Sequence, residues 1–159
     1  MGYYDAAQVC PNGHVANDTM HKAPEFNKAF CPQCGEPTTA ACPKCAAEIQ
    51  GEYHEPGVAV IGFPYHPPAF CHKCGAAFPW TERRKKAALE LLIEEEITDE
   101  DRRVFEQSVG EITKDTPEAQ VASKRILKVL RKVGSSTASA VRDILVDIAS
   151  EAAKKILLP

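Results

Sequence analysis

Four short pairs of metal-ligand residues dominate the first half of this 159-residue chain. They are Cys10 with His14, Cys31 with Cys34, Cys42 with Cys45, and Cys71 with Cys74. Seven cysteines are an odd number for disulfides, but with His14 they make eight ligands, enough for two sites of four. Four protein ligands of this kind suit tetrahedral zinc and leave no open coordination position. The pattern predicts two structural sites and two Zn²⁺ per chain, with iron the less favoured metal because the first set contains a histidine.

Two ways of pairing the four motifs are open. Sequential pairing joins the first motif to the second and the third to the fourth, which gives two zinc ribbons in tandem. Interleaved pairing joins the first to the third and the second to the fourth, as in cross-brace ubiquitin-ligase domains. Sixteen residues separate His14 from Cys31 and 25 separate Cys45 from Cys71. These lengths suit hairpins within a ribbon and favour sequential pairing.

The composition divides the chain into two parts. Residues 1–80 hold every cysteine and histidine, and residues 81–159 hold none. A segment of about 80 residues has a marginal hydrophobic core, and bound metal can supply on the order of 10 kcal/mol of folding free energy. The sequence therefore predicts a small metal-stabilised β domain over 1–80, followed by an all-α domain over 81–159. The fold class is α+β overall.

The charge and the apolar segments of the chain limit which partners and which compartment can be expected. The chain has a net charge of −3, and residues 1–80 carry 7 acidic against 4 basic side chains, which is not the dense positive charge of a nucleic-acid module. No basic segment followed by an apolar run opens the chain, and no stretch of about 20 apolar residues occurs. Unoxidised thiolates at metal spacing then indicate a cytoplasmic protein, with a membrane surface not expected as partner.

Residues 49–70 are rich in aromatic residues and proline. Val58, Val60 and Ile61 form a short β-like run between turn residues. Most aromatic side chains of this region are expected to form a small core. The alternative is an exposed aromatic rim that binds a partner. The aromatic residues concerned are Tyr53, Phe63, Tyr65, Phe70, Phe78 and Trp80.

The chain contains parts of two zinc-enzyme motifs but neither motif in full, so we expect no enzymatic activity. His54-Glu55 lacks the second histidine of a zinc protease, and Phe70 stands where a zinc deaminase has proline before its cysteine pair. Every cysteine already has a metal role. The spare histidines are expected to be loop side chains, with a further site of His54 and His66 beside Glu52 or Glu55 as the weaker alternative. The spare histidines are His21, His54, His66 and His72.

Four stretches resemble a bacterial family. They are residues 4–14 around the first motif, Phe30–Gly35, Pro68–Gly75 and Phe78–Thr81. The family is a set of double-zinc-ribbon proteins catalogued as a domain of unknown function, and the similarity extends into the second half of the chain. The resemblance implies zinc at all eight ligand positions and a bacterial cytosolic origin. It implies no substrate.

The second half is expected to form about four helices. Thr81 caps a helix over 82–96, Thr98 one to about 113, and Thr116-Pro117 one that stops at Gly134. A last helix follows from Ser135 to about 158. Its apolar stripe is a candidate self-association surface, formed by Val141, Ile144, Leu145, Ile148, Ala152 and Ile156. A candidate nucleic-acid patch is formed by Lys124, Arg125, Lys128, Arg131 and Lys132, although a solvated helix face explains it more simply.

Closed metal sites, absent catalytic groups and an amphipathic tail together favour a zinc-binding adaptor or scaffold. Its helices would bind another copy of the chain or a different protein. The alternative is a nucleic-acid-binding zinc-ribbon protein that uses the basic helix over 124–132.

Overall fold

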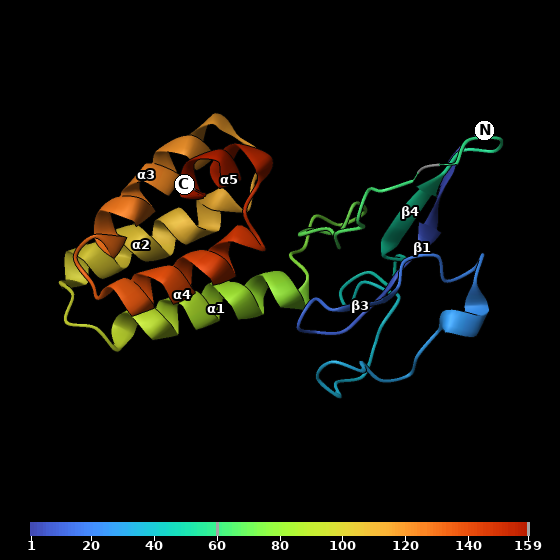
Figure 1. Cartoon of the computed structure of the whole chain (residues 1–159), viewed down its shortest axis with the longest axis horizontal. Coiled ribbons are helices and arrows are strands. Elements are labelled where there is room, and N and C mark those ends of the chain that lie inside the picture. The colour runs from blue at the N-terminus through green and yellow to red at the C-terminus, as the bar shows by residue number, and fades with distance from the viewer. Residues whose placement is uncertain (60, 159) are drawn as a thin grey trace. The chain divides into compact units, whose positions relative to one another are not determined.

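The computed structural model describes residues 1–59 and 61–158, which form two compact units (Figure 1). The ribbon unit is Met1–Thr81 and the helical unit is Glu82–Pro159. The boundary lies one residue after the expected one. Short antiparallel strands with two cysteine clusters precede the helices, so the predicted α+β class is confirmed.

The described residues of the ribbon unit form two sheets of two antiparallel strands. Strand β1 (Tyr3–Ala6) pairs with β4 (Gln50–His54), with Tyr4 opposite Tyr53. Strand β2 (Gln8–Val9) pairs with β3 (Val15–Asn17), and a short 3₁₀ helix, η1, spans Pro24–Phe26. Two-stranded sheets of this length are marginal alone, so the unit needs other cross-links.

The predicted β-like run is corrected by this topology. Val58 and Ile61 belong to no strand, and Val60 lies outside the described residues. The strand in this region is β4, which ends before a turn at Gly57 with a φ of 83°. Its partner β1 lies some 50 residues earlier, and short-range alternation in the sequence does not reveal such a pairing.

A small apolar core fills the ribbon unit. Phe78 and Trp80 stack with ring centroids 4.5 Å apart, and the indole N–H of Trp80 donates to the carbonyl of Pro68 at 2.9 Å. Phe63, by contrast, is 83 % exposed. The aromatic residues therefore divide between core and surface. The core consists of Ala7, Val9, Cys42, Ile49, Cys71, Phe78 and Trp80.

Within the described part of the second half, residues 81–158, the chain forms five helices where about four were expected. They are α1 (Pro79–Ile93), α2 (Asp99–Ile112), α3 (Pro117–Leu130), α4 (Ser135–Val146) and α5 (Glu151–Leu157). The expected last helix is broken between α4 and α5. Ser150 caps α5 by accepting from the N–H of Ala153, and its own N–H donates to the carbonyl of Ile112 at 2.8 Å. This contact with the end of α2 turns the chain, so that α5 packs beside α3 (Figure 1).

The break also changes the role of the apolar stripe. Val141 and Leu145 are fully buried and Ile148 is 5 % exposed, all within the core of the helical unit. Ile144, Ala152 and Ile156 are half-buried. Half of the stripe is therefore used inside the fold and the helix that carried it is broken, so the expectation of a continuous self-association face on one long helix needs correction. None of the described helices combines the length and apolar character needed to cross a membrane.

Two threonines at helix starts allow a matched test of capping. The Thr98 side chain accepts a hydrogen bond from the N–H of Asp101 at 3.1 Å. Thr116 makes no such cap bond, and its buried hydroxyl has no hydrogen-bond partner among residues 1–59 and 61–158. We expect Thr98→Ala to lower the free energy of unfolding of the helical unit by about 1 kcal/mol. We expect Thr116→Ala to change it by less than about 0.5 kcal/mol. Urea unfolding followed by far-UV circular dichroism measures both, and equal losses would contradict the assignment of the caps.

Candidate metal centres

The eight predicted ligands converge in two sets of four. Site 1 is Cys10, His14, Cys31 and Cys34, and within it one ligand atom from each residue lies within 4.8 Å of the others. Site 2 is Cys42, Cys45, Cys71 and Cys74, with the same spacing. These are the sequential sets, so the interleaved pairing is excluded.

The distances within each set match the edges of a coordination tetrahedron. The sulfurs of Cys10 and Cys34 are 3.7 Å apart, and the Nδ1 atom of His14 lies 3.5 Å from the sulfurs of Cys10 and Cys31. In site 2, Cys42 to Cys74 is 3.8 Å and Cys45 to Cys71 is 3.6 Å. Zinc–sulfur bonds of about 2.3 Å in a tetrahedron place sulfurs about 3.8 Å apart. A disulfide would need about 2 Å, so the cysteines are free thiols arranged for a metal ion.

Three of the four motifs fold into one repeated knuckle, begun by Cys31, Cys42 and Cys71. In each, the N–H of the first cysteine donates to the carbonyl five residues later, at 2.8 Å. The N–H four residues after that cysteine returns to its carbonyl at 2.8–2.9 Å. A third bond joins the N–H seven residues after it to the carbonyl two residues before it, at 2.8–3.0 Å. The knuckle is thus a backbone unit that aims two sulfurs at one point.

The first motif departs from this pattern because it has one more residue between its ligands. The N–H of Cys10 donates to the carbonyl of His14, and the N–H of Gly13 returns to Cys10. Gly13 has a φ of 87°, a left-handed conformation that glycine adopts without strain. The longer turn leaves room for the imidazole, which reaches the site through Nδ1.

Hydrogen bonds and burial separate the thiols into two kinds. The side-chain amide of Asn12, which lies 3.3 Å from the Cys34 sulfur, and the N–H of Glu36 lower the pKa of Cys34 to about 6. The N–H groups of Cys74 and Lys73 lower the pKa of Cys71 to about 6. Each site therefore holds one thiol that ionises readily, and the thiolate is the form that binds metal.

Two other thiols resist ionisation. The N–H of Ala47 lowers the pKa of Cys45, but burial and the neighbouring sulfurs outweigh it and raise the value to about 11. Burial also raises the pKa of Cys10. A bound divalent cation would offset these raised pKa values, because it stabilises the deprotonated form of every ligand.

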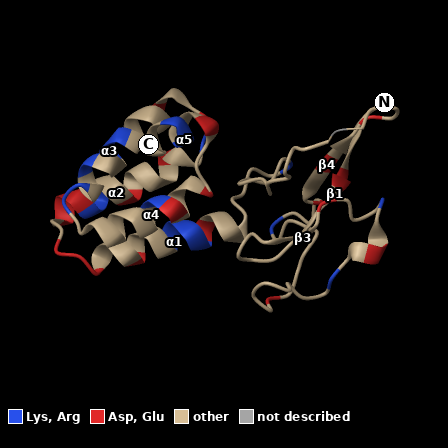
Figure 2. Ribbon diagram, viewed as in Figure 1, with Lys and Arg blue, Asp and Glu red and all other residues tan. Residues whose placement is uncertain are grey.

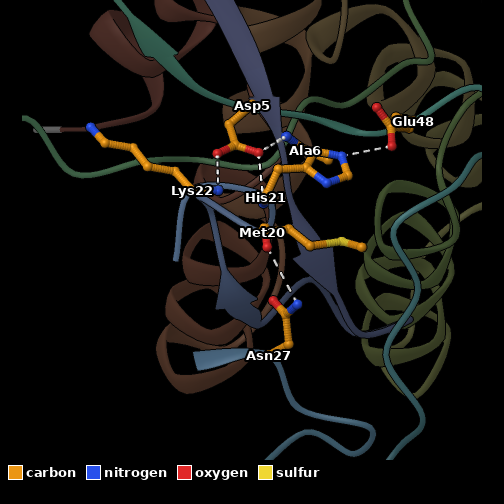
Figure 3. Close-up of polar contacts among 7 residues, drawn as sticks. All are labelled: Asp5, Ala6, Met20, His21, Lys22, Asn27 and Glu48. Carbon is orange, nitrogen blue, oxygen red and sulfur yellow. Dashed lines mark hydrogen bonds and ion pairs between the residues drawn. The ribbon is translucent and has the colours of Figure 1, made fainter. Parts of the chain in front are cut away.

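Asp5 anchors the loop between His14 and Cys31 to strand β1 (Figure 3). Its carboxylate accepts from the N–H groups of His21 and Lys22 at 3.0 Å and of Ala6 at 2.6 Å. Burial alone would raise the pKa of Asp5, but these donors outweigh it and hold the pKa below its usual value. Asp5 thus fixes the loop that leads into the second motif of site 1.

The spare histidines form no third ligand group among the described residues. His21 contacts the Glu48 carboxylate at 2.8 Å, and His54 lies 3.2 Å from the Lys22 amine and against the Tyr3 ring. His66 and His72 are exposed. The weaker alternative of a site at His54 and His66 gains no support from these contacts.

The predicted basic patch lies on α3, where Figure 2 shows basic residues in blue, and just after it. All five of its residues are exposed. Lys132 is bound by both carboxylate oxygens of Asp101 at 2.8 Å. That contact lowers the pKa of Asp101. One of the five cations is therefore already paired with an acidic side chain of α2.

A family model described as "uncharacterized protein conserved in bacteria" (DUF2321) matches residues 3–157. The chain belongs to this family. The predicted resemblance to an uncharacterised bacterial family is confirmed, with two ligand clusters consistent with a double ribbon. Neither a curated protein nor a solved structure matches the chain.

Sequence reasoning missed the residues that support the ligands. Asn12 was visible only as a spacer within the first motif, and Asp5 only as a residue before it. Their roles depend on contacts with Cys34, 22 positions away, and with His21 and Lys22, 16 and 17 positions away. A polar residue inside a metal motif was the one available signal for Asn12.

One knuckle carries a strained residue. Gly35 and Gly75 follow their cysteine pairs with φ values of 74° and 71°, whereas the equivalent Ala46 has a φ of 59°. A side chain in this conformation costs about 1 kcal/mol. We expect Ala46→Gly to raise the stability of metal-loaded protein by about 0.5 kcal/mol and Gly75→Ala to lower it by about 1 kcal/mol. The knuckles of Ala46 and Gly75 both belong to site 2, so urea unfolding followed by Trp80 fluorescence measures the effect of either substitution. Destabilisation by Ala46→Gly would contradict this account.

Proposed function

We propose that this protein is a zinc-binding, non-enzymatic scaffold of the reducing cytoplasm. In this proposal its ribbon unit presents a rigid surface to a protein partner. Sets of three or four thiolates in tetrahedral arrangement favour zinc over the harder divalent ions. Four protein ligands in each set supply all positions of tetrahedral zinc, which supports a structural metal rather than a catalytic one.

The observation that carries the proposal is the exposure of aromatic side chains on the β1/β4 sheet. Tyr3 is 50 % exposed, Tyr4 57 % and Tyr53 45 %, although a unit with so small a core has reason to bury them. Tyr4 and Tyr53 form an edge-to-face pair with centroids 5.1 Å apart, which holds both rings in fixed positions. Rigid exposed tyrosines are enriched in protein interfaces because they bury a large area at little entropic cost.

The same region favours protein over nucleic acid. Glu52 lies within β4 and Glu55 directly follows it, and the hydroxyl of Tyr53 donates to the Glu55 carboxylate at 2.9 Å. Acidic side chains beside the rings repel phosphate. A partner that meets this sheet with apolar and basic side chains fits the surface better.

We expect zinc-loaded full-length protein, immobilised and exposed to bacterial lysate, to capture a defined set of proteins. Tyr4→Ser combined with Tyr53→Ser should reduce that capture about tenfold, because interface tyrosines are frequent hot spots. Val121→Ser is the control, since Val121 is a 51 % exposed apolar side chain of the helical unit. Native mass spectrometry of the same samples should show two zinc ions per chain. Equal capture by the double variant, or no capture by a zinc-loaded monomer, would contradict the proposal.

A second candidate, nucleic-acid binding, is favoured by the exposure of Lys124, Arg125 and Lys128 on α3 and of Arg131 directly after it. We expect no binding of single-stranded RNA or duplex DNA at about 150 mM salt, because so few cations make too few phosphate contacts. Fluorescence anisotropy across a salt series tests this. Binding that weakens with salt and is lost in Lys128→Glu with Arg131→Glu would instead establish the second candidate.

A further inference from the structure

We propose that the two metal sites differ in role: site 2 is the permanent structural site, and site 1 exchanges its zinc with the surroundings. The proposal rests on the zinc binding proposed above and adds a division of labour within it. It follows from comparing knuckles that share one backbone but have different surroundings.

Site 2 is built into the apolar core of the ribbon unit. Cys42 and Cys71, each 3 % exposed, pack in one cluster with Ile49, Phe78 and Trp80. Ile49 and Phe78 each stand seven residues after the first cysteine of a knuckle, so both knuckles of site 2 direct a buried apolar side chain into this core. Loss of zinc here would separate the two halves of the core. Cys74 is exposed, so a chelator can reach that one ligand, but the buried sulfurs of Cys42 and Cys71 become accessible only when the core opens.

Site 1 has less of this apolar cover, because Val9, directly before Cys10, is the one residue next to a site 1 ligand that belongs to the described core cluster. In the knuckle of Cys31, Thr38 takes the position of Phe78 and Ala40 takes the position of Trp80. Phe30 precedes its knuckle as Phe70 precedes the last one, yet Phe30 is 64 % exposed whereas Phe70 is half-buried. Cys10 and Cys31 are buried, but neither belongs to the core cluster.

Polar contacts take the place of apolar packing at site 1. The Asn12 side chain donates to the Cys34 sulfur and so links the first motif to the second. Asp5 holds the loop between them through backbone N–H groups. Water can replace such polar contacts more readily than it can enter between packed apolar side chains. Site 1 also offers three thiolates and an imidazole against four thiolates at site 2, so one fewer negative charge holds the cation.

The single tryptophan makes the difference measurable. Trp80 is 2 % exposed and lies in the core around site 2, so its emission should report the state of site 2. The experiment uses the zinc-loaded full chain with an excess of pyridylazoresorcinol, which turns coloured on binding zinc. Trp80 emission is recorded at the same time. Pulses of N-ethylmaleimide followed by fragment mass spectrometry identify which cysteines have become free.

We expect release in two phases. The first zinc should leave at least about tenfold faster than the second, with Cys10, Cys31 and Cys34 alkylated and Trp80 emission unchanged. The second should leave together with a red shift of Trp80 emission and alkylation at site 2. Release of both ions in one phase, earlier alkylation at site 2, or a red shift with the first zinc would overturn the proposal. Protein that binds no zinc at either site would overturn the proposed function itself.

Asn12 supplies a matched variant. Removing a hydrogen-bond donor to a metal ligand commonly costs tenfold or more in metal affinity. We expect Asn12→Ala to accelerate the first phase about tenfold and to leave the second unchanged. The control is Lys44→Ala, which changes the residue two positions after Cys42 as Asn12 stands two positions after Cys10. An equal effect of both variants, or an effect of Asn12→Ala on the second phase, would contradict the role given to Asn12.

Discussion

The ribbon unit depends on the convergence of distant chain segments at two metal sites. Its strands are no longer than five residues and pair only in twos, and its apolar core is one small cluster. Such elements do not hold a chain of this size together in water. Metal ions held by the two ligand sets would supply the missing free energy, on the order of 10 kcal/mol for each structural zinc. The glycine turns and the Asp5 anchor then serve to place ligands rather than to build a core.

One backbone unit serves both sites, so coordination and packing are set by different residues. The cysteine pair and the turn after it determine where the sulfurs point. The residue seven positions later determines what covers them: Ile49 and Phe78 at site 2 are buried, whereas Thr38 at site 1 is half-exposed. A chain can therefore alter the access of solvent to a metal without altering the ligands. In this fold the residues that place the ligands and the residues that cover them can change separately.

Local features of this chain were predictable from sequence, and long-range ones were not. The ligand sets follow from the spacing of the cysteines and His14. Thr98 and Pro117 indicate where helices start, because the preferences at a helix start involve only neighbouring residues. The break between α4 and α5 escaped prediction because the apolar periodicity continues through it. It is imposed by the contact of Ser150 with Ile112, 38 residues earlier. Asn12 escaped for the same reason, since its partner lies in another motif.

The way the helical unit closes limits where a partner can bind. The stripe expected on one long helix is divided between α4, α5 and the break between them, and its residues Val141, Leu145 and Ile148 lie in the unit's own core. What remains outside on α3 is mainly charge, and Asp101 already neutralises Lys132. The ribbon unit shows the opposite balance, with aromatic rings left in solvent by a core too small to take them. A unit held by metal rather than by burial can leave apolar side chains exposed without losing its fold, and that freedom is what a recognition surface requires.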